Sequence, residues 1–277
     1  IEKKLLKIYL KKLKKTPELH DKIEFEISHN CFLPKTNDQI NSLKSELGEE
    51  YCNIMRESLI EITQNIFYNF KQIEKNDLES IKSLNLEREK KKAAYDNLSI
   101  QNKISLIIEI LDDIKIFGAV QFSRMARLAF IGNQFFKSLI ECNVISKESA
   151  NYFLSSIDTI ATKIKEDYKK VINNKITVEN FNDIYGHLRP GTYNINILPY
   201  SKDSNYFNIH GDGNYKKVYK EDLEKNDKTL RKNIDEYLTG FELDIDAETL
   251  LSFIEKTTKY RESFKFEFTK NLSLSIE

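Results

Sequence analysis

The chain has 277 residues, of which 40% are hydrophobic, and its 43 Lys and Arg residues balance 43 Asp and Glu residues, so the formal net charge is zero. This length suggests about two domains or one large domain, and the lack of a basic excess argues against a general nucleic-acid-binding protein. The low content of Gly and Pro (8 and 4 residues) excludes a low-complexity chain, no apolar run is long enough to span a membrane, and the start lacks a signal-peptide pattern.

The three cysteines, Cys31, Cys52 and Cys142, are widely spaced. They match neither a disulfide framework nor a zinc-binding pattern. With the composition, this spacing predicts a folded, soluble, cytoplasmic protein.

The first third of the chain predicts helices and one short strand. Residues Ile1–Leu13 carry apolar side chains at helical spacing among lysines, which predicts an amphipathic helix. Its lysines can bind an acidic partner or can form a solvated face. Residues Lys22–Ser28 alternate apolar and polar side chains, as a strand does. Helical periodicity returns from Thr36 to Tyr95, and the basic run Arg88–Lys92 is interpreted as the exposed end of that helix.

The most apolar stretch comes next, in the helical segments Ser105–Ile116 and Phe117–Cys142. The second segment is apolar around most of its circumference, which is typical of a helix in the middle of a bundle. Arg124 and Arg127 are three residues apart on it, so they share a face and are expected to be partly buried. A buried arginine needs an anion, either a core carboxylate in a salt bridge or a bound phosphate or carboxylate ligand. The sequence leaves both interpretations open.

Two further helices are expected at Ser146–Ile172 and Thr177–Tyr185. The composition then changes, because Gly186–Gly213 holds four of the eight glycines and two of the four prolines. A long irregular segment in a helical protein is usually a functional or a disordered loop. Helices resume afterwards in three segments, Leu223–Leu238, Ala247–Tyr260 and Arg261–Ile276.

The predicted fold is therefore a mainly α multi-helix bundle with a minor β element and a long functional loop. We expect one domain over residues 1–277, which can be divided into sub-lobes 1–175 and 176–277. No Walker loop, dinucleotide fingerprint, nucleophile elbow or zinc signature occurs in the sequence, so no cofactor or metal site is expected.

Polar side chains gather in the segment YGHLRPGTYNI at Tyr185–Ile195. Gly186 is expected to leave the helix with a positive φ, and Pro190–Gly191 favours a turn. Histidine can transfer protons near neutral pH, and arginine binds phosphate or carboxylate through its planar fork. The alternative is a polar loop that only packs on the bundle. The candidate residues are His187, Arg189, Thr192, Tyr193 and Asn194.

Four stretches together resemble one family. They are YGHLRPGTYNI (185–195), FSRMARLAFIG (122–132), RESFKFEFTKNLS (261–273) and IEFEISHNCF (23–32). Each fixes several polar residues at once, and together they span nearly the whole chain. They are similar to segments of the phosphoenolpyruvate synthase and pyruvate phosphate dikinase superfamily, in a subgroup with a nucleotide-binding front domain, a helical middle and a final phosphohistidine domain. Within it, the chain is most similar to the L-glutamine kinases of capsular phosphoramidate biosynthesis.

The resemblance implies that the 277 residues are the helical middle domain, without the nucleotide-binding and phosphohistidine domains. In that family the middle domain holds the acceptor, and a mobile histidine carries phosphoryl from ATP. The resemblance therefore implies phosphorylation of the side-chain amide nitrogen of L-glutamine. ATP and Mg would serve the parent enzyme, with no cofactor in this domain. The expected partners are L-glutamine and the two missing domains, without nucleic acid or membrane.

The resemblance also implies roles for residues. His187 and Arg189 would be catalytic, with Arg127 and Arg189 binding the acceptor carboxylate and the transferred phosphoryl group, and His187 orienting the acceptor or accepting its proton. The family signature ends in TYDI, so Asn194 replaces an aspartate that could act as a base or metal ligand. The implied substrate-binding residues are Arg124, Arg127, Thr192, Tyr193, Asn194, Arg261, Glu262, Lys265 and Asn271.

Two alternatives stay open: the same relay with a pyruvate-like or hydroxyl acceptor, and a non-catalytic scaffold that docks neighbouring domains. In the enzymatic case, the loop Gly186–Asn194 should fold against the helix that carries Arg124 and Arg127. The segment Arg261–Asn271 should close a third side, with Glu262 balancing the positive charges.

Overall fold

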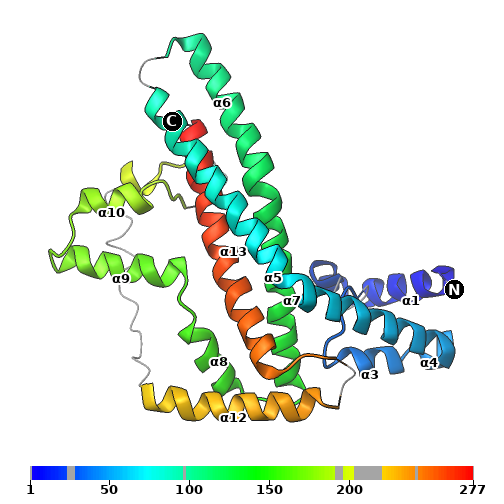
Figure 1. Cartoon of the computed structure of the whole chain (residues 1–277). Helices are drawn as coiled ribbons and strands as arrows, with labels where there is room; N and C mark the ends of the chain where they lie inside the picture. Colours follow the sequence, from blue (N-terminus) through cyan, green and yellow to red (C-terminus); the bar gives the residue numbers. More distant parts are fainter. Residues whose placement is uncertain are drawn as a thin grey trace. The chain divides into compact units, whose positions relative to one another are not determined.

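A computed structural model describes residues 2–23, 29–95, 98–190, 196–202, 220–240 and 243–276 (Figure 1). The described residues are helical almost throughout and contain no strand, which confirms the predicted mainly α multi-helix fold. Within them, no helix combines the length and the apolarity that a membrane span requires. The chain divides into two compact units, and the division falls inside its three longest described helices, α5 (Glu49–Ala94), α7 (Val120–Glu141) and α13 (Ala247–Ile276).

The first unit comprises Ile1–Gln72, Phe130–Leu154 and Tyr219–Ile254. Its core is aromatic where the long helices meet: the ring of Phe253 lies 4.6 Å from that of Phe67 and 4.8 Å from that of Phe70. Besides parts of the long helices, it contains a 3₁₀ turn at Pro17–Lys22, α1 (Glu2–Lys15), α3 (Thr36–Asn41), α4 (Lys44–Leu47), most of α8 (Lys147–Ser156) and α12 (Lys220–Leu238).

The strand predicted at Lys22–Ser28 is wrong where the structure describes it. Lys22 ends the 3₁₀ turn, and Ile23 has helical angles of φ −54° and ψ −39°. Pro17 stands at the start of this turn, where its fixed φ favours helical geometry over an extended chain. Residues 24–28 lie outside the described residues.

The second unit comprises Ile73–Ala129, Ser155–Val218 and Glu255–Glu277. At its centre, the second half of α5 packs beside α13 and beside α6 (Ile100–Ile114), which continues through a π-helical turn at Lys115–Ala119 into α7 (Figure 1). Two shorter helices, α9 (Ile160–Ile172) and α10 (Val178–Tyr185), pack against α13 through an aromatic cluster of Phe181, Tyr185 and Phe266.

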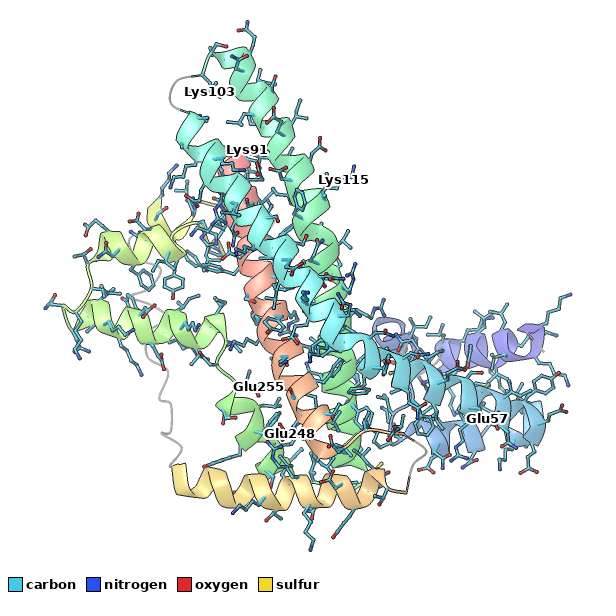
Figure 2. The ribbon with its side chains drawn as sticks, viewed as in Figure 1. Glu57, Lys91, Lys103, Lys115, Glu248 and Glu255 are labelled. Atoms are coloured by element: carbon cyan, nitrogen blue, oxygen red, sulfur yellow. The ribbon has the colours of Figure 1, made fainter. Side chains whose placement is uncertain are left out.

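The inward face of α5 in this unit repeats every three or four residues, through Asp77, Ile81, Leu84, Arg88 and Lys91. Its charged members have oppositely charged partners on neighbouring helices. Arg88 donates from Nη1 to Oε2 of Glu267 on α13 at 2.9 Å. Lys91, which is labelled in Figure 2, pairs with Asp113 on α6.

The basic run Arg88–Lys92 is therefore not simply an exposed helix end, as the sequence had suggested. The side chains of Arg88 and Lys91 are only 9% and 12% exposed. The prediction was wrong for these two residues because it rested on the charge of the run alone. The three- and four-residue spacing of the inward-facing positions of α5 continues through the run. Two of its positions face the bundle, where carboxylates make their burial tolerable.

Two predicted helix boundaries also differ. Ser146–Ile172 is two helices, because Thr159 starts α9 by accepting a hydrogen bond from the backbone N–H of Thr162 at 3.4 Å. Conversely, Ala247–Tyr260 and Arg261–Ile276 form the single helix α13, since nothing between them breaks it.

Candidate functional site

The segment that follows α10 is held at both ends. Tyr185 is buried in the aromatic cluster, and its hydroxyl donates to Oδ2 of Asp167 on α9 at 2.7 Å. The backbone N–H of Tyr200 donates to the carbonyl of Leu188 at 2.8 Å, and that of Ser201 to the carbonyl of Gly186 at 3.0 Å. These two bonds close the base of the loop, so the position of His187 is set by the packing of α10.

Gly186 is required here for a different reason from the one predicted. Its backbone is helical, with φ −61° and ψ −21°, so no positive φ occurs. A Cβ at this position would collide with the carbonyl oxygen of Asn182 and would come within 2.8 Å of Cβ of Ser201. The missing side chain therefore allows the loop base to approach the end of α10.

His187 packs against α13. Its ring lies 4.7 Å from that of Phe266 and nearly perpendicular to it, and neither ring nitrogen makes a hydrogen bond within the described residues. Burial is the main cause that lowers the pKa of His187 to about 4. The positive charges of Lys270 and Arg88 also lower this pKa, and the backbone carbonyls of Ile184 and Phe266 oppose the shift. The imidazole is therefore neutral at neutral pH and has a free lone pair.

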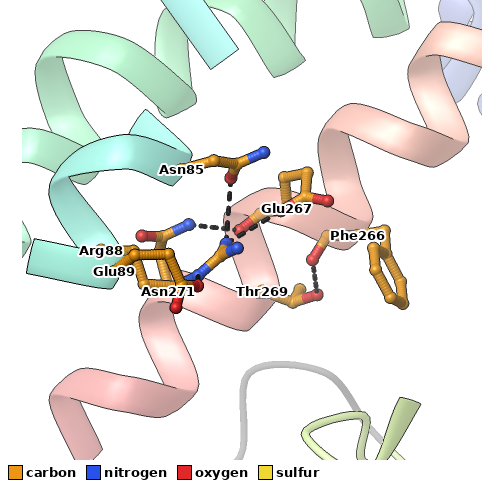
Figure 3. A network of polar contacts seen from close by, with 7 residues as sticks. All are labelled: Asn85, Arg88, Glu89, Phe266, Glu267, Thr269 and Asn271. Atoms are coloured by element: carbon orange, nitrogen blue, oxygen red, sulfur yellow. Dashed lines mark hydrogen bonds and ion pairs between the residues drawn. The ribbon is translucent and has the colours of Figure 1, made fainter. Parts of the chain in front are cut away.

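Arg88, on α5, is the centre of a polar network beside this histidine (Figure 3). Its Nη1 donates to Oδ1 of Asn85 and to Oε2 of Glu267, both at 2.9 Å. Its Nε donates to Oε1 of Glu89 at 3.1 Å. Burial lowers the pKa of Lys270, and Arg88 lowers it further, while Glu267 opposes the shift. A neutral imidazole thus lies beside two cationic side chains.

Arg189 follows the loop base and is half-buried. Its Nε is buried and makes no hydrogen bond among the described residues. An unpaired buried donor is costly unless a ligand or solvent satisfies it. Within the described part of the chain, His187 and Arg189 are therefore neighbouring residues with unused hydrogen-bonding capacity.

Arg124 and Arg127, on α7, are both exposed, so the predicted partial burial is wrong. The buried face of α7 in this unit holds Met125 and Leu128 instead, and Arg124 lies at the edge of that face. Arg124, whose side chain is 41% exposed, donates from Nη1 to Oδ1 of buried Asp77 at 2.8 Å. This is the structural salt bridge that the sequence had left as one of two interpretations.

The substrate-binding candidates on α13 are arranged differently from the prediction. Arg261 donates from Nη2 to Oε1 of the adjacent Glu262 at 2.6 Å, so Glu262 balances the charge of Arg261. Asn271 is buried and donates to the backbone carbonyl of Glu267 at 2.8 Å. Lys265 is half-buried.

The loop candidates Thr192, Tyr193 and Asn194 lie outside the described residues.

The structure thus brings the His187 segment to the Arg261–Ser273 segment, as predicted, while Arg124 pairs with Asp77. Sequence reasoning missed Arg88, Glu267 and Lys270. The three- and four-residue spacing of the inward-facing positions of α5 could have identified Arg88. Glu267 and Lys270 lie one and four positions after Phe266, within the same segment of α13, and this place could have identified them.

Elsewhere, the described residues offer no competing site. They contain no cluster of His, Cys, Asp or Glu side chains that could hold a metal ion. A pocket of about 110 Å³ lies elsewhere in the second unit, and none of the predicted site residues lines it. Its walls include Lys91, Tyr95, Lys103, Leu106, Ile110 and Leu274.

Comparison of the chain with protein-family models, curated proteins and solved structures finds no significant match. Its function must therefore be argued from its residues and their arrangement.

Proposed function

We propose that this chain is the acceptor-binding domain of an ATP-dependent phosphohistidine-relay kinase, and that the acceptor is L-glutamine. One observation carries the proposal. Two segments that each resemble the same family, 185–190 and 261–273, are far apart in sequence yet meet where His187 packs on Phe266. The meeting point holds the cations Arg88 and Lys270, with Glu267 and Glu89 as their counter-charges.

The chemistry of these residues suits an amino-acid acceptor. Arg189 has a buried donor to offer to a carboxylate, and Lys270 adds positive charge nearby. Phosphoryl transfer depends chiefly on positioning and on positive groups that stabilise the charge on the transferred oxygens. In the parent enzyme, ATP with Mg would supply the phosphoryl group to the carrier histidine.

In the relay that the resemblance implies, the P–N bond to the carrier imidazole breaks and a new P–N bond forms at the amide nitrogen of glutamine. That nitrogen loses one proton. His187 is neutral and buried, so its free lone pair can accept a hydrogen bond from the amide N–H and orient it. With a pKa of about 4 it is a weak base, so the lost proton passes to the carrier imidazole nitrogen that the bond cleavage frees. His187 would orient the acceptor here and not carry the phosphoryl group.

A thermal-shift screen tests the acceptor class. Ligand at tenfold its Kd should stabilise the fold by about 1.4 kcal/mol, which raises Tm by a few degrees for a chain of this size. We expect L-glutamine to give this shift and pyruvate and simple sugars to give none. A shift with a keto acid or a hydroxyl compound alone would replace glutamine by that acceptor, and no shift with any of them would contradict the proposal.

The scaffold alternative keeps one specific observation in its favour. Arg124 is engaged in an ion pair with Asp77, as a purely structural arginine would be. If no small molecule shifts Tm but the chain binds separately prepared phosphohistidine and nucleotide-binding domains, the scaffold interpretation is the better one.

A further inference from the structure

The helix α1 (Glu2–Lys15) separates its side chains into two faces. It has seven lysines and one glutamate among 14 residues, EKKLLKIYLKKLKK. At helical spacing, the apolar residues share one side of the helix and most of the lysines share the other. The apolar side includes Leu5, Ile8, Tyr9 and Leu13, which are half-buried, and Leu6 and Leu10, which are exposed.

The exposed edge of α1 is a mixed surface of leucine and lysine. Leu6 and Leu10 are one turn apart and 57% and 47% exposed. Lys3, Lys7 and Lys14 are also exposed, and each lies three or four positions from one of these leucines. We call these five residues the α1 edge.

The positive charge of the chain is concentrated in α1. The helix α1 has a net charge of +6, from seven lysines and one glutamate, while the whole chain is neutral, so the remaining residues carry −6. An anionic surface would therefore attract the chain at α1 and repel it elsewhere. Nucleic acid would use the lysines but would gain nothing from two exposed leucines.

We propose that α1 binds the surface of an anionic lipid bilayer, with Leu6 and Leu10 inserted at the interface and Lys3, Lys7 and Lys14 at the level of the phosphates. Basic amphipathic helices bind membranes in this way, parallel to the surface, and lysine stems extend so that their charged ends reach the headgroups. Such binding needs no membrane-spanning helix, and it is independent of the proposed acceptor site in the second unit.

Flotation of the chain with vesicles tests this directly. We expect binding to phosphatidylcholine vesicles that contain phosphatidylserine, no binding to phosphatidylcholine alone, and release by salt. The chain has no Trp, so Leu10→Trp introduces a single reporter whose emission should shift to the blue on binding.

Two variants separate the contributions. Leu6→Gln/Leu10→Gln and Lys3→Glu/Lys7→Glu/Lys14→Glu should each weaken binding by more than about tenfold, because apolar insertion and electrostatic attraction both contribute. The matched controls are Leu86→Gln and Lys71→Glu/Lys75→Glu/Lys82→Glu, at exposed positions of α5, which should bind normally. Circular dichroism checks that each variant stays helical.

Four outcomes would overturn the proposal. They are no flotation, equal flotation with neutral vesicles, normal binding by the leucine variant, and binding of polyglutamate in place of vesicles. The last would indicate an acidic protein partner.

Discussion

His187 shows how burial sets the chemistry of a single residue. Its pKa falls from the usual 6.5 to about 4, chiefly because the ring is desolvated. The unfolded chain therefore binds a proton at a pH where the folded chain does not, and the stability that depends on neutral His187 is lost as the pH falls from about 6.5 towards 4.

His187→Gln should therefore have a flatter pH dependence than the unmodified chain. Between pH 7 and pH 5, we expect the unmodified chain to lose about 2 kcal/mol more of its free energy of unfolding than the variant does. Urea titrations at several pH values measure this difference. Equal slopes, or an NMR titration that puts the pKa of His187 above 6, would show that the residue is not buried as described.

Gly186 makes a second test at the residue scale. Gly186→Ala must displace Asn182 or Ser201, because its Cβ has no room at the loop base. Overpacking of this kind costs about 1–3 kcal/mol, and urea denaturation should show a loss in that range. Gly240→Ala is the control, since its Cβ would meet only the carbonyl of Tyr237 at 3.3 Å. If both substitutions lower the free energy of unfolding equally, a Cβ at position 186 does not collide with Asn182 and Ser201 as described.

Among the helices, α5 shows most clearly what an ion pair does in a bundle. Asp77 is 2% exposed, and one of its oxygens, Oδ2, makes no hydrogen bond within the described residues. Burial raises the pKa of Asp77, and Arg124 opposes the shift. The carboxylate therefore depends on Arg124 to stay charged at low cost.

Arg124→Met should leave this carboxylate buried without its cation. We expect a loss of about 1–3 kcal/mol in the free energy of unfolding at pH 7. The loss should shrink towards pH 5, because protonation of Asp77 removes the buried charge. Lys232→Met, which breaks an exposed pair with Glu236, is the control and should change the free energy by less than about 0.5 kcal/mol. A loss that grows on acidification would contradict this account.

The elements also show what the sequence could predict. The helix α10 was predicted closely because Thr177 caps it by accepting a hydrogen bond from the N–H of Asn180. The burial of Arg88 and Lys91 was not predicted, since it depends on carboxylates from α13 and α6 that are distant in sequence. The exposure of Arg127 was missed for the related reason that composition cannot show which side of α7 its neighbours cover.

For the candidate site, the resemblance indicated the two segments that meet, but not how their charges are balanced. Glu262 was the expected counter-charge, yet it pairs with Arg261, and Glu267 pairs with Arg88 instead. Glu262 lies one turn before Phe266 on the same face of α13, whereas Glu267 is turned towards α5, where Arg88 lies. The fold class and the meeting of the segments were therefore predictable, and the ion-pair partners were not.

At the scale of the whole molecule, the proposal implies that this chain binds the acceptor while other domains of the parent enzyme use ATP. A domain that only holds the acceptor should neither hydrolyse ATP nor phosphorylate glutamine by itself. We expect the purified chain with ATP, Mg and L-glutamine to release no AMP above background. Steady AMP release by the chain, absent from a matched preparation of His187→Gln, would mean that it does more than hold the acceptor.

The central claim is that the His187–Arg189 segment binds the acceptor, and a calorimetric titration with L-glutamine tests it most directly. We predict saturable heat for the unmodified chain. Binding should be weaker by about 1.5–3 kcal/mol for Arg189→Ala, the scale of a hydrogen bond to a charged group. Arg231→Ala, in the first unit, should bind normally. No heat at millimolar L-glutamine, or normal binding by Arg189→Ala, would contradict the account.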